Sequence, residues 1–137
     1  LRDQVAIDLE LEADLPPVRC QAGRLNQVFM NMITNAAHAT MAREDLAPAD
    51  RLIYIQSKKE VRGDKTRVII RIEDNGIGMS ESVRKQIFDP FFTTKSVGEG
   101  TGLGLSIVMG ILSDHQAEVD VQSTPQTGTA FTLTFTA

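Results

Sequence analysis

Apolar and polar residues alternate in several separate stretches of the chain, which indicates β-strands with one buried face. Near the N-terminus, Ile7, Leu9 and Leu11 alternate with acidic residues, and the alternation stops before two prolines at 16–17. We therefore expect a half-buried strand there. The same alternation is found in "LIYIQS" (52–57), "RVIIRIED" (67–74), "AEVDVQS" (117–123) and "TAFTLTFT" (129–136). A turn around residues 62–65 predicts that the first two of these form an antiparallel hairpin.

Three other stretches predict helices. The longest runs from Arg24 to Met41, where the apolar residues recur every three to four positions and lie on one face of an amphipathic helix. Residues 81–88 predict a short helix with Ser80 as its N-cap, and residues 105–112 predict a third helix. We expect one domain over residues 1–137, with no internal boundary. The predicted class is α+β, a two-layer α/β sandwich whose mixed, mostly antiparallel sheet carries about three helices on one face.

Composition and charge exclude several classes of function. The net charge of −4 at pH 7 argues against a nucleic-acid partner and against direct membrane contact, because both select for a basic face. No apolar run approaches the roughly 18 residues of a membrane span. The single cysteine, Cys20, excludes an internal disulfide and a cysteine-rich metal site, and we expect it to be buried as a small apolar residue.

Glycines occupy alternate positions in "GEGTGLGLSIV" (98–108), directly before the third predicted helix. The spacing fits neither the P-loop nor the Gly-x-Gly-x-x-Gly pattern. Backbone without Cβ atoms lets N–H groups approach an anion closely, and a helix N-terminus adds unpaired donors and the positive end of a dipole. The stretch suits a phosphate, and a flexible loop before a helix is an equal alternative.

A polar strip runs along the longest predicted helix. Asn31, Asn35 and His38 are spaced i, i+4 and i+7, which places them on one line beside the apolar stripe. Asparagine is a mediocre helix former, so the pair indicates a use such as oxygen donation to Mg²⁺. Two buried asparagines that bond a neighbouring loop are the alternative, and an ordinary boundary histidine is the better interpretation of His38 alone.

A carboxylate ends the β-branched strand in "EDNGIGM" (73–79). Asp74 is followed by Gly76 and Gly78, which let the backbone turn sharply and approach a flat ligand. A carboxylate there could accept a hydrogen bond from an exocyclic amino group such as that of adenine. Taken alone, the same residues also fit an ordinary turn.

Five motifs, in this order, resemble the N, G1, F, G2 and G3 boxes of the catalytic, ATP-binding domain of sensor histidine kinases. They are "NQVFMNMITNA", "DNGIGM", "IFDPFFTTK", "GTGLGLS" and "TGTAFTLTF", and they extend from about Arg24 to Phe135. These kinases belong to the GHKL superfamily with type II topoisomerases, mismatch-repair ATPases and a heat-shock chaperone. The resemblance implies the Bergerat fold of that superfamily, with ATP and Mg²⁺ as ligands.

The resemblance also assigns roles to single residues. Asp74 would bind the adenine amino group, Gly76 and Gly78 would let the base lie against the backbone, Asn35 would ligate Mg²⁺, and Thr129 would support the base through water. The further nucleotide-binding residues that it implies are His38, Met79, Gly100, Thr101, Gly102, Leu103, Gly104 and Leu105.

A lid over the nucleotide would run from about Phe91 to Gly104, and it resembles the short lid of kinases with a "PFFTTK" F box, such as those of nitrogen regulation. Its only lysine, Lys95, is the candidate γ-phosphate contact and, with Asn31, one of two candidate catalytic residues. Asn31 stands where hydrolysing members carry a glutamate that acts as general base for water. An amide cannot take a proton near neutral pH, so we expect poor activation of water.

A second departure from the family pattern lies in "SDHQAE" (113–118), where Gln116 and Ala117 replace two glycines. We expect an altered turn there and no catalytic role for His115. Neither His38 nor His115 lies in an acceptor motif of the family, in which an acidic residue and a proline follow the histidine.

The resemblance therefore implies a fragment of a two-component sensor kinase. It would bind Mg-ATP and transfer the γ-phosphoryl group to a histidine on a separate, upstream dimerisation hairpin, which then serves a response regulator. We expect a cytoplasmic location and a monomer for the isolated domain. Two alternatives remain: a GHKL ATPase or anti-sigma-type serine kinase, and a nucleotide-gated interaction module without phosphotransfer. Asn31 argues against the ATPase, and "DPFFTTK" against the anti-sigma type.

Overall fold

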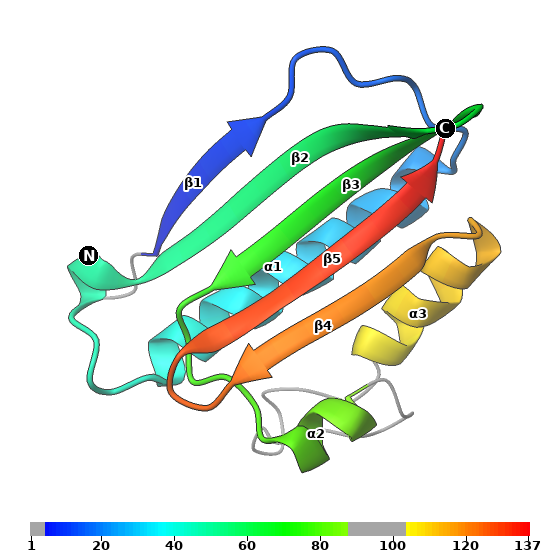
Figure 1. Ribbon diagram of the computed structural model, residues 1–137. Helices are drawn as coiled ribbons and strands as arrows, with labels where there is room; N and C mark the ends of the chain where they lie inside the picture. The colour runs from blue at the N-terminus through cyan, green and yellow to red at the C-terminus, as the bar shows by residue number, and fades with distance from the viewer. Residues whose placement is uncertain (1–4, 88–103) are drawn as a thin grey trace.

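The computed structural model describes residues 5–87 and 104–137, which contain a five-stranded sheet (Figure 1). The strands lie in the order β1-β2-β3-β5-β4. β1 is parallel to β2, and the other neighbouring pairs are antiparallel. The strand bounds are β1 (Ala6–Leu11), β2 (Leu52–Arg62), β3 (Lys65–Asp74), β4 (Glu118–Thr124) and β5 (Gly128–Thr136). The predicted mixed, mostly antiparallel sheet is confirmed.

The described helices form a second layer on one side of this sheet. They are α1 (Ala22–Ala42), α2 (Glu81–Gln86) and α3 (Gly104–Asp114), with a short 3₁₀ turn at Pro48–Asp50. The Ser80 side chain accepts a hydrogen bond from the N–H of Val83, so the predicted N-cap of α2 is confirmed. No helix within the described ranges is long and apolar enough to cross a membrane.

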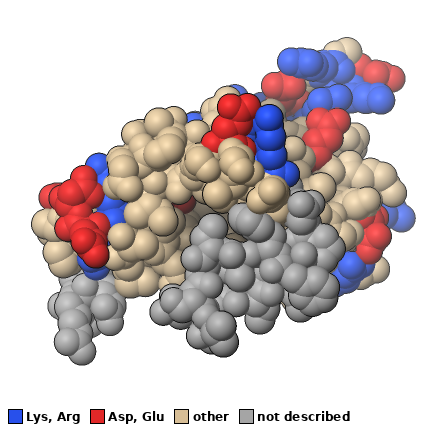
Figure 2. Space-filling view, turned by 90° about the horizontal axis from the view of Figure 1, so that it is seen from below, with Lys and Arg blue, Asp and Glu red and all other residues tan. Residues whose placement is uncertain are grey.

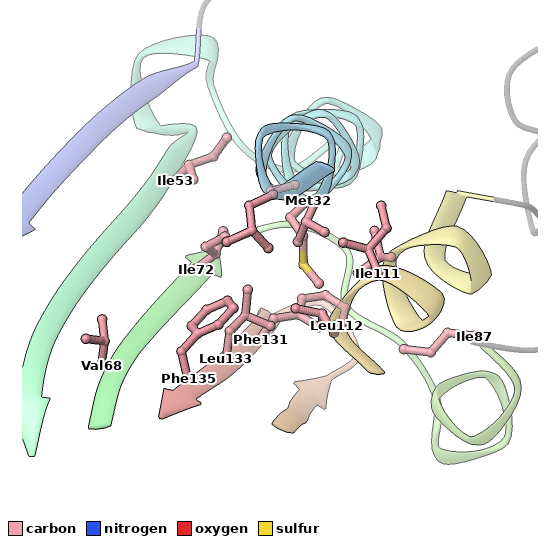
Figure 3. Close-up of a cluster of buried hydrophobic side chains, with 14 residues drawn as sticks. Met32, Ile53, Val68, Ile72, Ile87, Ile111, Leu112, Phe131, Leu133 and Phe135 are labelled. Atoms are coloured by element: carbon pink, nitrogen blue, oxygen red, sulfur yellow. The ribbon is translucent and has the colours of Figure 1, made fainter. Parts of the chain in front are cut away.

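The core fills the space between α1, α3 and the strands β2, β3 and β5. Figure 3 shows Met32 of α1 pointing down between the sheet and α3, toward Leu112 and Phe131. Ile87, just after α2, is buried beside Leu112, which brings α2 to the same side of the sheet. Burial of these apolar side chains is the main favourable contribution to folding.

The edge strand β1 departs from its prediction as a half-buried strand. Ile7, Leu9 and Leu11 are 52–58% exposed, although the register pairs Ile7 with the buried Ile53 and so points this row toward the helix side. α1 lies over β2, β3 and β5, and α2 and α3 contact β4, so β1 is the edge strand that the described helices leave uncovered. The prediction that Cys20 is buried is also wrong, since it is exposed in the segment before α1.

The N-terminal end of α1 is fastened to the C-terminal end of α3. Arg24 forms an ion pair with Asp114 at 2.8 Å. Nε2 of His115 accepts a hydrogen bond from the N–H of Gln21 at 3.0 Å, and Nδ1 lies 2.8 Å from the carbonyl oxygen of Ile111. The neutral tautomer with its proton on Nδ1 satisfies both contacts. His115 therefore caps α1, which has no side-chain cap of its own, and holds two helix ends together.

The turn after α3 holds Gln116 in a left-handed backbone conformation. N–H groups of Gln116 and Ala117 donate to the carbonyl oxygens of Ser113 and Leu112, which is a Schellman motif, and Gln116 has φ +52°. Glycine adopts this conformation without strain, so Gln116→Gly is expected to stabilise the fold by about 0.5–1 kcal/mol in urea unfolding. Gln122→Gly, in the extended strand β4, is the matched control and should destabilise it. A loss of stability in both variants would contradict the prediction.

Candidate functional site

The last residue of β3 is a buried acid. Asp74 is only 7% exposed, and its Oδ1 accepts a hydrogen bond from the N–H of Gly76 at 2.8 Å. Burial disfavours the charge and raises the pKa of the Asp74 carboxyl from its ordinary 3.8 to about 6, although backbone hydrogen bonds from Gly76 and Thr129 lower it. The charged neighbour that affects this pKa is Glu73, another acid. A buried carboxylate in such surroundings is costly in the free protein and marks a candidate ligand site.

Sheet register extends this site across three strands. Asp74 of β3 is paired with Thr129 of β5, and Thr129 is paired with Ser123 of β4. Paired residues point to the same face, so the three polar side chains form one row on the helix side of the sheet. The hydroxyl oxygens of Ser123 and Thr129 are 2.8 Å apart, and Thr129 is buried like Asp74.

The loop that follows β3 forms hydrogen bonds with the start of β2, with the segment before it and with α1. The Asn75 side chain accepts a hydrogen bond from the N–H of Leu52 at 2.9 Å and donates one to the carbonyl of Asp50 at 2.8 Å. The N–H of Ile77 donates to the carbonyl oxygen of Ala39 in α1 at 3.1 Å. These bonds fix the loop against both the sheet and α1.

Glycine is required in this loop by protein contacts. A Cβ on Gly76 would lie 2.5 Å from the carbonyl carbon of Ala39. Gly78 has φ +66°, and a Cβ there would lie 2.0 Å from the carbonyl oxygen of Thr124. The predicted approach of a base to these glycines stays a prediction, because the protein backbone alone already accounts for both of them.

The predicted polar strip lies on the flank of α1 that faces α3. Asn31 and Asn35 are half-buried and His38 is exposed. Arg24, on the same flank, reaches Asp114 of α3. Asn35 is one helical turn before Ala39, where the loop after β3 is attached. In Figure 1, β3 and α1 end and α3 begins toward the same lower end of the molecule, which brings the strip and Asp74 to one side.

The remaining predicted site residues divide into two groups. Met79 packs partly buried against the core, and its N–H donates to the Ser123 hydroxyl at 2.8 Å. Gly104 begins α3, as the glycine pattern indicates, and the side chain of Leu105 packs against the core. The predictions for Lys95, Gly100, Thr101, Gly102 and Leu103, and for the lid of which they are part, lie outside the described residues.

A metal ion at this end of the molecule would depend on a bound ligand. Within residues 5–87 and 104–137, no three His, Cys, Asp or Glu side chains gather in a way that could hold a metal. Mg²⁺ binds through few protein oxygens, with waters and substrate phosphates completing its shell, so one amide oxygen such as that of Asn35 fits it. Figure 2, which views the molecule from this end, shows charged side chains at both ends of the described surface and an acidic and a basic group side by side in its upper middle, with uncharged surface among them.

The sequence patterns did not identify Ser123 and Gly128 as residues of the site. Ser123 bonds both Met79 and Thr129, and Gly128 has φ +143° with no room for a Cβ, which would lie 2.0 Å from the Asp74 carbonyl oxygen. The turn between β4 and β5 is the signal that could have revealed Ser123, because it sets Ser123 opposite Thr129.

Comparison with known proteins places the chain in a family of ATPases. Residues 20–137 match the family described as histidine kinase-, DNA gyrase B-, and HSP90-like ATPase. Sporulation kinase E of Bacillus subtilis (strain 168) is 37% identical over 130 residues, covering 95% of this chain and 16% of that protein. The signal transduction histidine-protein kinase AtoS of Escherichia coli (strain K12) is 40% identical over 124 residues, covering 90% of this chain and 18% of that protein. The chain thus spans less than a fifth of either relative's length.

Solved structures agree with the sequence relatives. Full-length ShkA in complex with AMPPNP superimposes with a TM-score of 0.77 at 26% identity, covering 97% of this chain and 26% of that one. A nucleotide-free catalytic domain of histidine kinase ThkA gives a TM-score of 0.74 at 26% identity, covering 96% of this chain and 80% of that one. The chain therefore belongs to the family of histidine kinase-, DNA gyrase B- and HSP90-like ATPases.

Proposed function

We propose that this chain is the ATP-binding catalytic domain of a longer sensor histidine kinase. The observation that carries the proposal is the buried carboxylate of Asp74, whose raised pKa shows that burial opposes its charge. Above pH 6 the ionised carboxyl accepts hydrogen bonds only, and an exocyclic amino group supplies the matching donors. Adenine carries such a group, and the similar ShkA structure contains AMPPNP, an ATP analogue.

Other residues of the site would contact the base, the metal ion and the phosphates of Mg-ATP. Thr129 lies next to Asp74 and would support the base through water. The amide oxygen of Asn35 would hold Mg²⁺, which when bound neutralises charge on the phosphates. The N-terminus of α3 at Gly104 would direct backbone N–H groups and the positive end of the helix dipole toward the phosphates. Lys95 is our proposed contact to the γ-phosphate.

Phosphoryl transfer needs an acceptor that lies outside this chain. A histidine nitrogen on an upstream helical hairpin would attack the γ-phosphorus in line, forming the N–P bond as the P–O bond to ADP breaks. Positioning and electrostatic stabilisation supply most of the catalysis in such reactions. Asn31, where hydrolysing relatives would carry a base, takes no proton, so the phosphoryl group is kept for the histidine. The acceptor then serves a response regulator, and we place the domain, as a monomer when isolated, in the cytoplasm.

Calorimetric titration of the chain with ATP, with and without Mg²⁺, tests the ligand assignment. The wild-type chain should bind ATP more tightly when Mg²⁺ is present. Asn35→Ala should lose this gain and keep the affinity for metal-free ATP, because the side chain that it truncates is the proposed metal ligand. Thr34→Ala, an exposed neighbour on α1, is the matched control. Absence of ATP binding, or an unchanged Mg²⁺ effect in the folded Asn35→Ala variant, would contradict the assignment.

A further inference from the structure

The Ser123 hydroxyl is hydrogen-bonded on three sides. It accepts from the N–H of Met79 at 2.8 Å and lies 3.1 Å from the carbonyl oxygen of Gly128. Its third contact is the Thr129 hydroxyl at 2.8 Å. Ser123 is one strand further from Asp74 than Thr129, so Thr129 lies between Ser123 and Asp74 in this row.

Only one placement of protons makes all three contacts hydrogen bonds. The carbonyl oxygen of Gly128 can only accept, so the single proton of Ser123 must point to it. The Met79 N–H already donates to Ser123, so Thr129 must donate its own proton to the Ser123 oxygen as well. If Ser123 instead donated its proton to Thr129, no proton would lie between the Ser123 hydroxyl oxygen and the carbonyl oxygen of Gly128, and these two oxygens would repel each other. Thr129 is then left with lone pairs only on its remaining side.

We propose that Ser123 is a positioning residue that fixes Thr129 as a hydrogen-bond acceptor, and that the site thereby selects a 6-aminopurine nucleotide over a 6-oxopurine one. This inference rests on the proposed ATP-binding function and adds to it a source of base selectivity. Asp74 and Thr129 together present acceptors to the ligand, which suit an amino group and repel an oxo group. A water bound to Thr129 donates one hydrogen bond to the Thr129 hydroxyl oxygen and can donate a second to ring nitrogen N1 of the base. N1 accepts such a bond in a 6-aminopurine. In a 6-oxopurine N1 carries a hydrogen and cannot accept it.

Removal of the Ser123 hydroxyl frees the Thr129 proton. Thr129 can then donate as well as accept, and it no longer discriminates between the two kinds of purine. We expect Ser123→Ala to change ATP binding by less than about 2-fold and to strengthen inosine triphosphate binding by about 5-fold, the value of one ordinary hydrogen bond, because the freed Thr129 proton matches an acceptor of the 6-oxopurine. The preference for ATP over inosine triphosphate should therefore fall by a similar factor.

Titration calorimetry of the whole chain with both nucleotides measures this ratio. Ser123→Thr keeps the hydroxyl and should keep the preference, and Thr124→Ala, an exposed neighbour at the same strand end, is the matched control. In a Thr129→Val background, Ser123→Ala should cause no further loss of preference, because the two residues act as one unit. A general loosening of the fold would weaken both nucleotides equally and leave the ratio unchanged.

The outcomes separate the inference from the function on which it rests. A wild-type chain that binds no ATP would overturn both. A wild-type chain that prefers ATP, together with a folded Ser123→Ala variant whose preference is unchanged, would overturn the role of Ser123 and leave the ATP site standing. A preference that falls in Ser123→Ala and survives in Ser123→Thr is the expected result.

Discussion

Asp74→Asn is expected to lower the affinity for ATP by at least about 100-fold, measured by calorimetry at pH 7.5. The side chain keeps its size and its hydrogen bond from Gly76, but it loses the charge and gains an N–H₂ group that faces the donors of the base. A site built to hydrogen-bond one ligand rejects a mismatched partner, because buried polar groups are then left unpaired. The loss of affinity in such cases reaches about 100-fold or more. Asp120→Asn, an exposed acid on β4, is the control and should bind ATP normally. Retained affinity in Asp74→Asn would refute the adenine assignment.

The same substitution should make the free chain more stable. The pKa of Asp74 is about 6 in the folded chain against an ordinary 3.8, so between these values the folded state binds more protons than the unfolded state. Stability therefore falls as pH rises through this window, and the full cost, about 3 kcal/mol, is present above pH 6. In urea unfolding, Asp74→Asn should exceed the wild type at pH 7.5, and the difference should vanish near pH 4. A variant less stable than wild type at pH 7.5 would contradict this interpretation.

Gly78→Ala is expected to destabilise the fold by about 3 kcal/mol or more in urea unfolding. The new Cβ would lie 2.0 Å from the carbonyl oxygen of Thr124 and 2.7 Å from its carbonyl carbon. Both are backbone atoms that cannot rotate away, and φ +66° adds strain for a residue with a side chain. Relief of the clash would separate the loop after Asp74 from the turn between β4 and β5, so ATP binding should be lost as well.

Gly110→Ala provides the matched control for this substitution. Gly110 lies inside α3, and a Cβ there meets nothing within 4 Å. Alanine in an exposed helix is better than glycine by about 1 kcal/mol, so this variant should be slightly more stable than wild type. If the two alanine variants had similar stabilities, the close approach of Gly78 to Thr124 would be wrong.

Local patterns in the sequence predict the elements well because each pattern depends on neighbouring residues. The amphipathic period predicts α1 to within two residues at its start and one at its end, and the alternation predicts β2 and β3 with the turn between them. The exposure of Ile7, Leu9 and Leu11 could not be predicted in this way. Alternation shows that a strand has an apolar face, and only the tertiary arrangement decides whether a helix covers it.

The sequence names residues of the candidate site without their connections. The roles of Asp74, Asn35 and Thr129 come from their resemblance to motifs and stay predictions, and the row that joins Asp74 to Thr129 and Ser123 depends on the pairing of β3 with β5 and of β5 with β4. Strands β3 and β5 are separated by more than fifty residues, and no local pattern specifies their register. The same holds for Gly128, whose need for glycine arises from the distant backbone of Asp74.

We propose that the γ-phosphate of ATP is transferred to a histidine outside this chain, and labelled ATP distinguishes this transfer from hydrolysis. The native chain extended upstream would be incubated with γ-labelled ATP and Mg²⁺, and label on protein would be followed against free phosphate. We expect an acid-labile, base-stable label on an upstream histidine, which Asp74→Asn abolishes. Steady release of phosphate without labelled protein would contradict the claim and indicate an ATPase, and nucleotide binding with neither product would indicate a nucleotide-gated interaction module.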